Sequence, residues 1–339
     1  MCQLLGMNCA TPTDFCFSFS GFRLRGGLND KHSDGYGIAI YQGPGLRTYT
    51  DTLPAAESPI AEMISKYPIK TLNMMAHIRY ATQGGGGLEN CHPFQRELWG
   101  IHFSFCHNGD VSKFASHQHP SQYPLLGKTK LKKDRYYIPV GDTDSESMFC
   151  AILNALRNEY ADSPPSLPEM YKSIQRLCEE IVQGEEETAI VNFLLCCGEY
   201  TQFAYSWPGK RPGSTVWNGL FYTIREPPFT TAELTDIDYT VDFSKLTTQD
   251  DRVAVITTKP LTKNETWVEM KKGELLMFDQ GLPYGDAHDC HTIEKEGRGL
   301  CSKLRQPLKD IMIPTNPTVL GERSPEGVGR FMNQVMRNH

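Results

Sequence analysis

The sequence lacks several features that would place it in a broad class of protein. No stretch approaches about 20 consecutive apolar residues, which argues against a transmembrane helix, and the N-terminus has no charged region followed by an apolar segment, as a secretory signal would. The 11 cysteines are odd in number and include no C-x-x-C pair, which argues against a disulfide framework and a zinc ribbon. A net charge of −6 argues against nucleic-acid binding. We therefore expect a cytoplasmic protein whose partners are neither nucleic acid nor membrane.

The composition is that of a folded protein. The 339 residues are 39% hydrophobic and 22% charged, which is enough to bury a core in one large domain or two ordinary ones. Apolar runs predict strands, and apolar residues at helical spacing predict two helices, one starting near Asp144 behind a Thr143–Glu146 capping box and one ending at Gly184. The predicted strands lie at 36–43, 72–81, 101–109, 188–197, 200–207, 219–225, 251–258 and 273–281.

The order of these elements indicates the fold class. Strands come first, then the two helices, then strands again, which is not the regular alternation of a doubly wound sheet. This order favours an α+β protein with antiparallel sheets and helices gathered on a face. The Lys-rich stretch 117–139 is interpreted as a long surface loop. We expect a domain at 2–284 and a largely irregular or disordered tail at 285–339, where Pro, Gly and charged residues are frequent.

Cys2 stands out because it directly follows the initiator methionine in MCQLLGMN. Once Met1 is removed, this one residue carries a thiol with an ordinary pKa of about 8.5 and an α-amine with a pKa of roughly 7.7–8.0. Such a residue can supply both a nucleophile and, through its amine, a base. The motifs offer no clear Cys–His pair that would provide a different base.

Two further motifs each allow an ordinary and a functional interpretation. Arg79 ends a predicted strand just before four glycines, 84–87. It is either a surface arginine beside a flexible turn or a guanidinium that binds a ligand carboxylate. Asn108-Gly109 is either a hairpin turn, for which Asn-Gly is a strong signal, or an oxyanion hole built from the Asn amide and the Gly N–H.

The acidic cluster Asp142, Asp144 and Glu146 also has two interpretations. It either complements the start of a helix or includes a carboxylate that binds a substrate ammonium group. Taken together, a thiol nucleophile, a carboxylate binder, an oxyanion hole and an ammonium binder describe an enzyme for an amino acid that carries an amide. Glutamine fits, with its α-carboxylate at Arg79, its α-ammonium at Asp144 and its side-chain amide at Cys2.

These segments resemble a known family. The ordered set MC, RGG…SDGYGIA, AHIRYAT, HNG and TDSE is similar to the class II glutamine amidotransferases, which are N-terminal-nucleophile hydrolases. The segments CxLLGMN, ENCHPFQRELWG and KPLTKNETW resemble the stand-alone YafJ-type branch of that family. The resemblance extends from residue 2 to about residue 280 and implies a four-layer αββα sandwich of two antiparallel sheets.

The resemblance also implies roles for individual residues. By position, it implies that Cys2 is the nucleophile and that Asn108 and Gly109 form the oxyanion hole. It also implies that Arg79, Thr82 and Asp144 bind the substrate and that Arg25 supports the site. The segment 79–87 matches a loop that closes over glutamine, but Tyr80 and Gln83 replace the Trp and His often found there in the sugar-phosphate branch. Neither a cofactor nor a metal is expected.

Several alternatives remain open. The ammonia or the glutamyl group could pass to a separate acceptor or synthase subunit, or the chain could act alone on a glutathione-like γ-glutamyl compound. A catalytically silent, regulatory protein that binds a glutamine-like ligand is a third alternative. A metal site built from His77, His92, His107 or the HQH at 117–119 is a fourth, although these residues lack the tight spacing of metal ligands.

Overall fold

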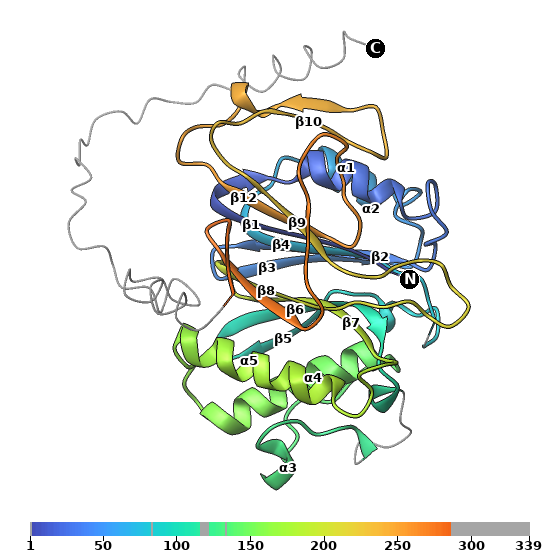
Figure 1. The fold of residues 1–339 in the computed structure, drawn as a ribbon, viewed down its shortest axis with the longest axis vertical. Helices are drawn as coiled ribbons and strands as arrows, with labels where there is room; N and C mark the ends of the chain where they lie inside the picture. The colour runs from blue at the N-terminus through green and yellow to red at the C-terminus, as the bar shows by residue number, and fades with distance from the viewer. Residues whose placement is uncertain (1, 83, 116–121, 133, 286–339) are drawn as a thin grey trace, which may run out of the picture. The chain divides into compact units, whose positions relative to one another are not determined.

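The computed structural model describes residues 2–82, 84–115, 122–132 and 134–285, which are arranged in four layers (Figure 1). Two antiparallel sheets face each other. The helices α1 (Cys16–Leu24) and α2 (Pro59–Lys66) cover one sheet, and α4 (Asp144–Tyr160) and α5 (Leu167–Val182) cover the other. The predicted αββα sandwich of the α+β class is therefore confirmed. The tail predicted at 285–339 lies outside the described residues except for Gly285, so the boundary at 284 stays a prediction.

All strand pairs in the two large sheets are antiparallel. From edge to edge, the first sheet consists of β13 (Val268–Glu269), β9 (Phe221–Arg225), β12 (Val253–Thr257), β1 (Gln3–Asp14), β4 (Lys70–Ile78), β2 (Tyr36–Gln42) and β3 (Gly45–Asp51). The second consists of β15 (Leu282–Tyr284), β14 (Glu274–Asp279), β8 (Thr201–Trp207), β7 (Ile190–Cys197), β6 (Ile101–Asp110) and β5 (Phe94–Leu98).

Smaller elements complete the described chain. Short strands β10 (Thr231–Glu233) and β11 (Thr240–Asp242) pair only with each other, and α3 (Thr129–Lys132) is a single turn. Single 3-10 turns occupy η1 (Leu88–Asn90), η2 (Ser112–Phe114) and η4 (Phe243–Lys245). No helix within the described ranges is long and apolar enough to cross a membrane.

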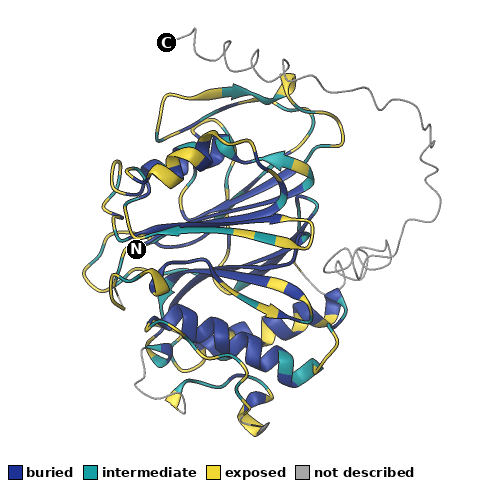
Figure 2. Cartoon of the chain, turned by 180° about the vertical axis from the view of Figure 1, so that it is seen from behind, coloured by how far each residue is buried: buried dark blue, intermediate teal, exposed yellow. Residues whose placement is uncertain are grey.

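Three apolar clusters fill the spaces between the four layers, and Figure 2 shows the two sheets as largely buried. Leu4, Met75, Cys106, Leu194 and Ile256 are among the side chains packed between the two sheets. Phe19 and Ile64 are among those under α1 and α2, and Phe149 and Ile174 are among those under α4 and α5. Because the central strands are covered on both faces, they consist of nearly continuous apolar residues.

Local sequence explains where the helices begin. Ser58 accepts a hydrogen bond from the Ala61 N–H at 3.4 Å, and Pro59 occupies the first turn of α2, a position that suits proline because its missing N–H would have no partner there. Thr143 caps α4 by accepting from the Glu146 N–H at 3.2 Å. The cap energy of such a side chain is about 1 kcal/mol.

Two local predictions are wrong. The capping box at Thr143 is only half formed, because the Glu146 carboxylate turns away to an ion pair with Arg96 at 2.5 Å. The stretch 117–139 is not a loop throughout, since it contains the α3 turn, and Leu126 is buried in the core under α4 and α5. Part of this stretch, 117–121 and 133, lies outside the described residues.

Candidate active site

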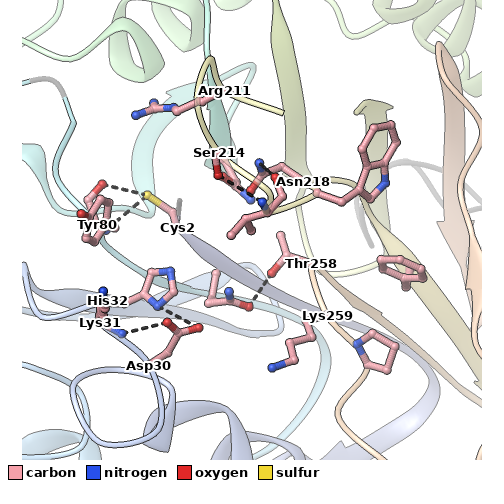
Figure 3. Close-up of a pocket in the computed structure, with 16 residues that line it drawn as sticks. Cys2, Asp30, Lys31, His32, Tyr80, Arg211, Ser214, Asn218, Thr258 and Lys259 are labelled. Carbon is pink, nitrogen blue, oxygen red and sulfur yellow. Dashed lines mark hydrogen bonds and ion pairs between the residues drawn. The ribbon is translucent and has the colours of Figure 1, made fainter. Parts of the chain in front are cut away.

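Cys2 and Arg79 come together because of the pairing of two neighbouring strands. Gln3 at the start of β1 pairs with Ile78 at the end of β4. Cys2, which precedes Gln3, and Arg79, which follows Ile78, therefore lie at the same end of the sheet. The Tyr80 N–H donates a hydrogen bond to the Cys2 sulfur at 3.4 Å, and the sulfur lies 3.6 Å from the Tyr80 carbonyl oxygen (Figure 3). The antiparallel register thus sets the first residues of β1 against the segment that follows β4.

The protonation state of Cys2 follows from its surroundings. The residue is partly exposed, but burial of its sulfur raises the pKa of the thiol above the ordinary value. The Tyr80 N–H and the positive charges of Arg79 and Arg211 oppose that rise in pKa without cancelling it. The thiol is therefore mostly protonated near neutral pH, and nucleophilic attack by the sulfur requires a nearby base.

Arg79 is held in place at the end of β4. Its N–H donates to the Gly35 carbonyl at 2.8 Å, and its carbonyl accepts from the Asp34 N–H at 3.2 Å. The Asp34 carboxylate accepts from the Ala81 N–H at 2.8 Å, so the chain is also fixed beyond Arg79. The Arg79 side chain is only 2% exposed. A buried guanidinium on a fixed backbone is well suited to bind a carboxylate in a defined orientation.

Asn108 and Gly109 lie inside β6 and not in a turn. They pair with Asn192 and Val191 of β7, so the hairpin interpretation of this dipeptide is wrong. Asn108 is buried and lines a cleft that Cys2 also lines. A Cβ atom on Gly109 would lie 1.8 Å from the Ile190 carbonyl oxygen. Glycine is therefore required here by close approach of the neighbouring strand.

Asp144 is the first residue of α4, and its buried carboxylate accepts hydrogen bonds from two donors. Its Oδ2 accepts from the Val111 N–H at 3.1 Å, and its Oδ1 accepts from the Ser145 hydroxyl at 3.2 Å. The Ser145 hydroxyl lies 2.9 Å from the His107 Nδ1. This chain of contacts fixes the Asp144 carboxylate close to β6, the strand that carries Asn108.

The other two acids of the cluster have structural partners. Asp142 accepts from the Asn90 side-chain amide at 2.7 Å and from the Gly85 N–H at 3.3 Å. Glu146 accepts from the Val140 and Gly141 N–H groups at 3.1 and 2.7 Å. Asp142 therefore holds the glycine-rich segment, and Glu146 closes the turn before α4. The structural interpretation therefore holds for Asp142 and Glu146, and ammonium binding by Asp144 stays a prediction.

Arg25 supports one wall of the cleft from behind. Its side chain is 1% exposed and forms an ion pair with Asp236 at 2.7 Å. It also donates to the carbonyl oxygens of Lys259 and Pro260, each at 2.7 Å. Lys259 and Pro260 line the cleft, so Arg25 orders this wall without lining the cleft itself.

Arg211, which no sequence motif indicates, joins three segments above Cys2 (Figure 3). Arg211 Nη2 lies 2.8 Å from the Thr82 hydroxyl, 3.3 Å from the Gly109 carbonyl oxygen and 3.2 Å from the Asp110 carboxylate. Thr82 is exposed and follows β4, whereas Gly109 and Asp110 end β6. Arg211 belongs to the loop between β8 and β9, where no recognisable motif precedes it.

The cleft that contains Cys2 has a volume of about 690 Å³, and we call it the Cys2 cleft. Cys2, Tyr80 and Asn108 line one part of it, together with Arg211. Asp30, Lys31 and His32 line another part, and Figure 3 shows them on the opposite side from Arg211. No sequence motif indicates these three residues, because the loop 25–35 carries no pattern that shows which side chains face the cleft.

Four of the described histidines differ in their surroundings. His77, His92 and His107 are buried, and the rings of His77 and His92 lie 4.0 Å apart between centroids. Burial lowers the pKa of all three, that of His77 to about 3. His32 instead lines the Cys2 cleft, where its Nδ1 lies 3.4 Å from the Asp30 carboxylate. In the part of the chain that the structure describes, no group of His, Cys, Asp or Glu is arranged to hold a metal.

Comparisons with known proteins agree with this architecture. The family model for glutamine amidotransferases class-II matches residues 1–299. A protein of Haemophilus influenzae named "Putative glutamine amidotransferase" is 41% identical over 281 residues, which cover 83% of this chain and 85% of that protein. An Escherichia coli protein named "Putative glutamine amidotransferase YafJ" is 40% identical over 83% of this chain and 98% of its own length.

A solved structure agrees as well. The crystal structure of a predicted glutamine amidotransferase from Pseudomonas aeruginosa is 33% identical in sequence. It matches with a TM-score of 0.59 over 84% of this chain and 100% of that one. With the family model covering most of the sequence, the chain belongs to the class II glutamine amidotransferase family, whose fold is that of the N-terminal-nucleophile hydrolases.

Proposed function

We propose that the chain hydrolyses the amide bond of a γ-glutamyl compound, glutamine in the simplest case, with Cys2 as nucleophile after removal of Met1. The observation that carries the proposal is that Cys2 and Asn108 line one cleft while Arg79 lies beside Cys2. A thiol, a side-chain amide and a guanidinium gathered in this way supply attack, oxyanion stabilisation and substrate binding.

Substrate binding uses the two fixed charges. Arg79 binds the α-carboxylate, and Asp144, fixed by the Val111 N–H, binds the α-ammonium group. Thr82 contributes a hydroxyl from the segment that follows β4. These contacts orient the γ-carbonyl carbon toward the Cys2 sulfur, and such positioning is a large part of the rate enhancement of many enzymes.

The attack uses both reactive groups of Cys2. The α-amine takes the thiol proton, directly or through one water, and the sulfur forms a bond to the γ-carbonyl carbon. The Asn108 side-chain amide and the Gly109 N–H stabilise the negative charge on the carbonyl oxygen. Removal of one such donor costs about 2.7–4 kcal/mol of transition-state stabilisation in a well-studied enzyme.

Collapse of this intermediate breaks the carbon–nitrogen bond. The leaving nitrogen takes the proton from the α-ammonium group of Cys2, and ammonia or an amine departs. A thioester between Cys2 and the glutamyl group remains. Water then attacks the thioester while the α-amine takes a proton from it, which releases glutamate and regenerates the thiol. A different acceptor in place of water, on a partner subunit, would receive the glutamyl group from the same thioester.

The proposal is tested by measuring glutamate and ammonia released from glutamine and from γ-glutamyl amides. Cys2→Ser should lose most of the activity with the fold intact, because a hydroxyl is a far weaker nucleophile than a thiolate at neutral pH. Cys16→Ser is the matched control, since Cys16 is also a half-buried free thiol but lies at the start of α1. Equal turnover by wild type and Cys2→Ser would overturn the proposal, as would the absence of glutamate release from any of these compounds.

A further inference from the structure

The Cys2 cleft is larger than the release of ammonia requires. Hydrolysis of glutamine expels a molecule of the size of water, which occupies about 30 Å³ in the liquid, whereas the cleft has a volume of about 690 Å³. Arg79, Thr82 and Asp144, the proposed partners of the α-groups, do not line it. The cleft therefore extends from the nucleophile to a region that the glutamyl part of the substrate does not fill.

One wall of this region is apolar and held in a fixed position. The loop between β8 and β9 closes on itself, since the N–H groups of Gly209 and Asn218 each donate to the other residue's carbonyl at 3.0 Å. At its end, Val216 and Trp217 line the cleft and are 58% and 48% exposed. The Trp217 Nε1–H donates to the Glu269 carboxylate at 2.7 Å, so the ring is oriented although half of it lies open.

Another part of the lining carries positive charge. Lys31 and Lys259 line the cleft and are exposed, and Figure 3 shows both on the side opposite Arg211. Among the described residues, neither lysine takes part in an ion pair. The nearby Asp30 carboxylate accepts from the Lys31 backbone N–H at 2.8 Å and lies 3.4 Å from His32.

We propose that this region is a subsite for the leaving amine of the substrate, and that it takes an amine with a large apolar body and a carboxylate. A γ-glutamyl derivative of an apolar amino acid has this form, because its amide nitrogen belongs to an amino acid with its own side chain and carboxylate. The side chain packs on Trp217 and Val216, and the carboxylate is attracted by Lys31 and Lys259. This inference rests on the proposed hydrolysis at Cys2 and names its substrate class.

The test compares three substrates that differ only in the leaving group. These are γ-glutamylphenylalanine, γ-glutamylphenethylamide, which keeps the ring but lacks the carboxylate, and glutamine. We expect kcat/KM to be at least about tenfold higher for γ-glutamylphenylalanine than for glutamine, since a buried aromatic ring alone contributes that much to binding. The kcat/KM for the phenethylamide should lie between these two values. Raised salt should reduce the difference in kcat/KM between the phenethylamide and γ-glutamylphenylalanine.

Two variants separate the contributions of the walls. In Lys31→Gln/Lys259→Gln, the ratio of kcat/KM for γ-glutamylphenylalanine over the phenethylamide should fall about fivefold. In Trp217→Ala, the ratio of kcat/KM for the phenethylamide over glutamine should fall about tenfold. Lys172→Gln is the control, because Lys172 is an exposed lysine on α5 that does not line the cleft, and it should leave both ratios unchanged.

The outcomes distinguish this inference from the proposed function. If glutamine is hydrolysed by a Cys2-dependent reaction but γ-glutamylphenylalanine is no better a substrate, the subsite is wrong and the hydrolysis stands. Unchanged ratios in the two cleft variants would overturn the subsite as well. If none of the three compounds releases glutamate, both the subsite and the proposed function are wrong.

Discussion

The guanidinium of Arg211 lies 2.8 Å from the hydroxyl of Thr82, and this contact joins the loop between β8 and β9 to the segment that follows β4. The same guanidinium reaches the Gly109 carbonyl at 3.3 Å and the Asp110 carboxylate at 3.2 Å. Segments from both sheets are thus connected above Cys2 by one side chain. Because Arg211 also opposes the rise in the pKa of the Cys2 thiol, its loss should affect both the loop and the nucleophile.

We predict that Arg211→Ala raises KM for glutamine and raises the pKa of Cys2. Thr82→Val, which removes only the hydroxyl, should raise KM through the same contact. In a double-mutant cycle on kcat/KM, the two changes should show a coupling of about 1 kcal/mol. Thiol alkylation rates as a function of pH measure the pKa. Additive effects in the cycle would show that the contact between the two side chains does not contribute to activity.

A second prediction concerns the base. If the α-amine of Cys2 accepts the thiol proton, an added Met-Lys before Cys2 that cannot be removed should lower kcat/KM by about 10²-fold or more. In the processed enzyme, kcat/KM should fall as pH drops below roughly 7.7–8.0, because the amine becomes protonated. Mass spectrometry confirms the N-terminus of each preparation. An extended protein with normal activity would contradict the role of the amine.

His32 offers a check on the same point, since it lines the Cys2 cleft and its Nδ1 lies near Asp30. If the amine is the base, kcat/KM of His32→Gln should fall at the same low pH as in the wild type, whatever the effect of the substitution on KM. If kcat/KM of His32→Gln no longer falls at low pH, the imidazole of His32 is the base.

Much of the fold could be predicted from sequence because its central strands carry unbroken apolar runs. β7 is buried along its whole length, and its residues IVNFLLCC indicate this directly. β3 and β5 were not predicted because they are edge strands, in which exposed polar residues interrupt the apolar ones. β1 was not predicted because Gly6 and Pro12 interrupt its apolar residues, and both residue types weaken a strand pattern.

The site was only partly predictable, for a physical reason. Cys2, Arg79 and Asn108 lie next to recognisable motifs, but their proximity depends on long-range strand pairing. Asn-Gly favours a turn locally, and pairing with β7 overrides that preference. The positions of Arg211 and Trp217 depend on how one loop folds back over the sheets. A short sequence pattern contains no information about that path.

The buried histidines lead to a prediction about stability. Burial lowers the pKa of His77, His92 and His107 in the folded protein, while the unfolded chain has ordinary values near 6.5. Below pH 6.5 the unfolded chain binds more protons, so the free energy of unfolding should fall as pH falls. For His77 the loss continues down to a pH of about 3. Each histidine contributes a slope of up to about 1.4 kcal/mol per pH unit.

Urea unfolding at pH 7.5, 6.5 and 5.5 measures this slope. His92→Gln should make the slope shallower, because one titrating group is removed from the core. His102→Gln is the control, since His102 is exposed on β6, and it should leave the slope unchanged. If the free energy of unfolding is the same at pH 7.5 and pH 5.5, the three imidazoles are not held neutral by burial.

The last prediction concerns Gly109. A Cβ atom at this position would lie 1.8 Å from the Ile190 carbonyl oxygen and 2.3 Å from the His107 ring, so Gly109→Ala forces β6 away from β7. We expect a loss of about 3 kcal/mol in the free energy of unfolding. We also expect lower kcat in the protein that remains folded, because the proposed oxyanion donor moves with the strand. Gly45→Ala is the matched control, since the nearest atom to a Cβ there is 3.4 Å away. Thermal unfolding and glutamate release measure the two effects. An unchanged melting temperature in Gly109→Ala would mean that the strands can separate at this point without cost, and the close approach would then not explain the glycine.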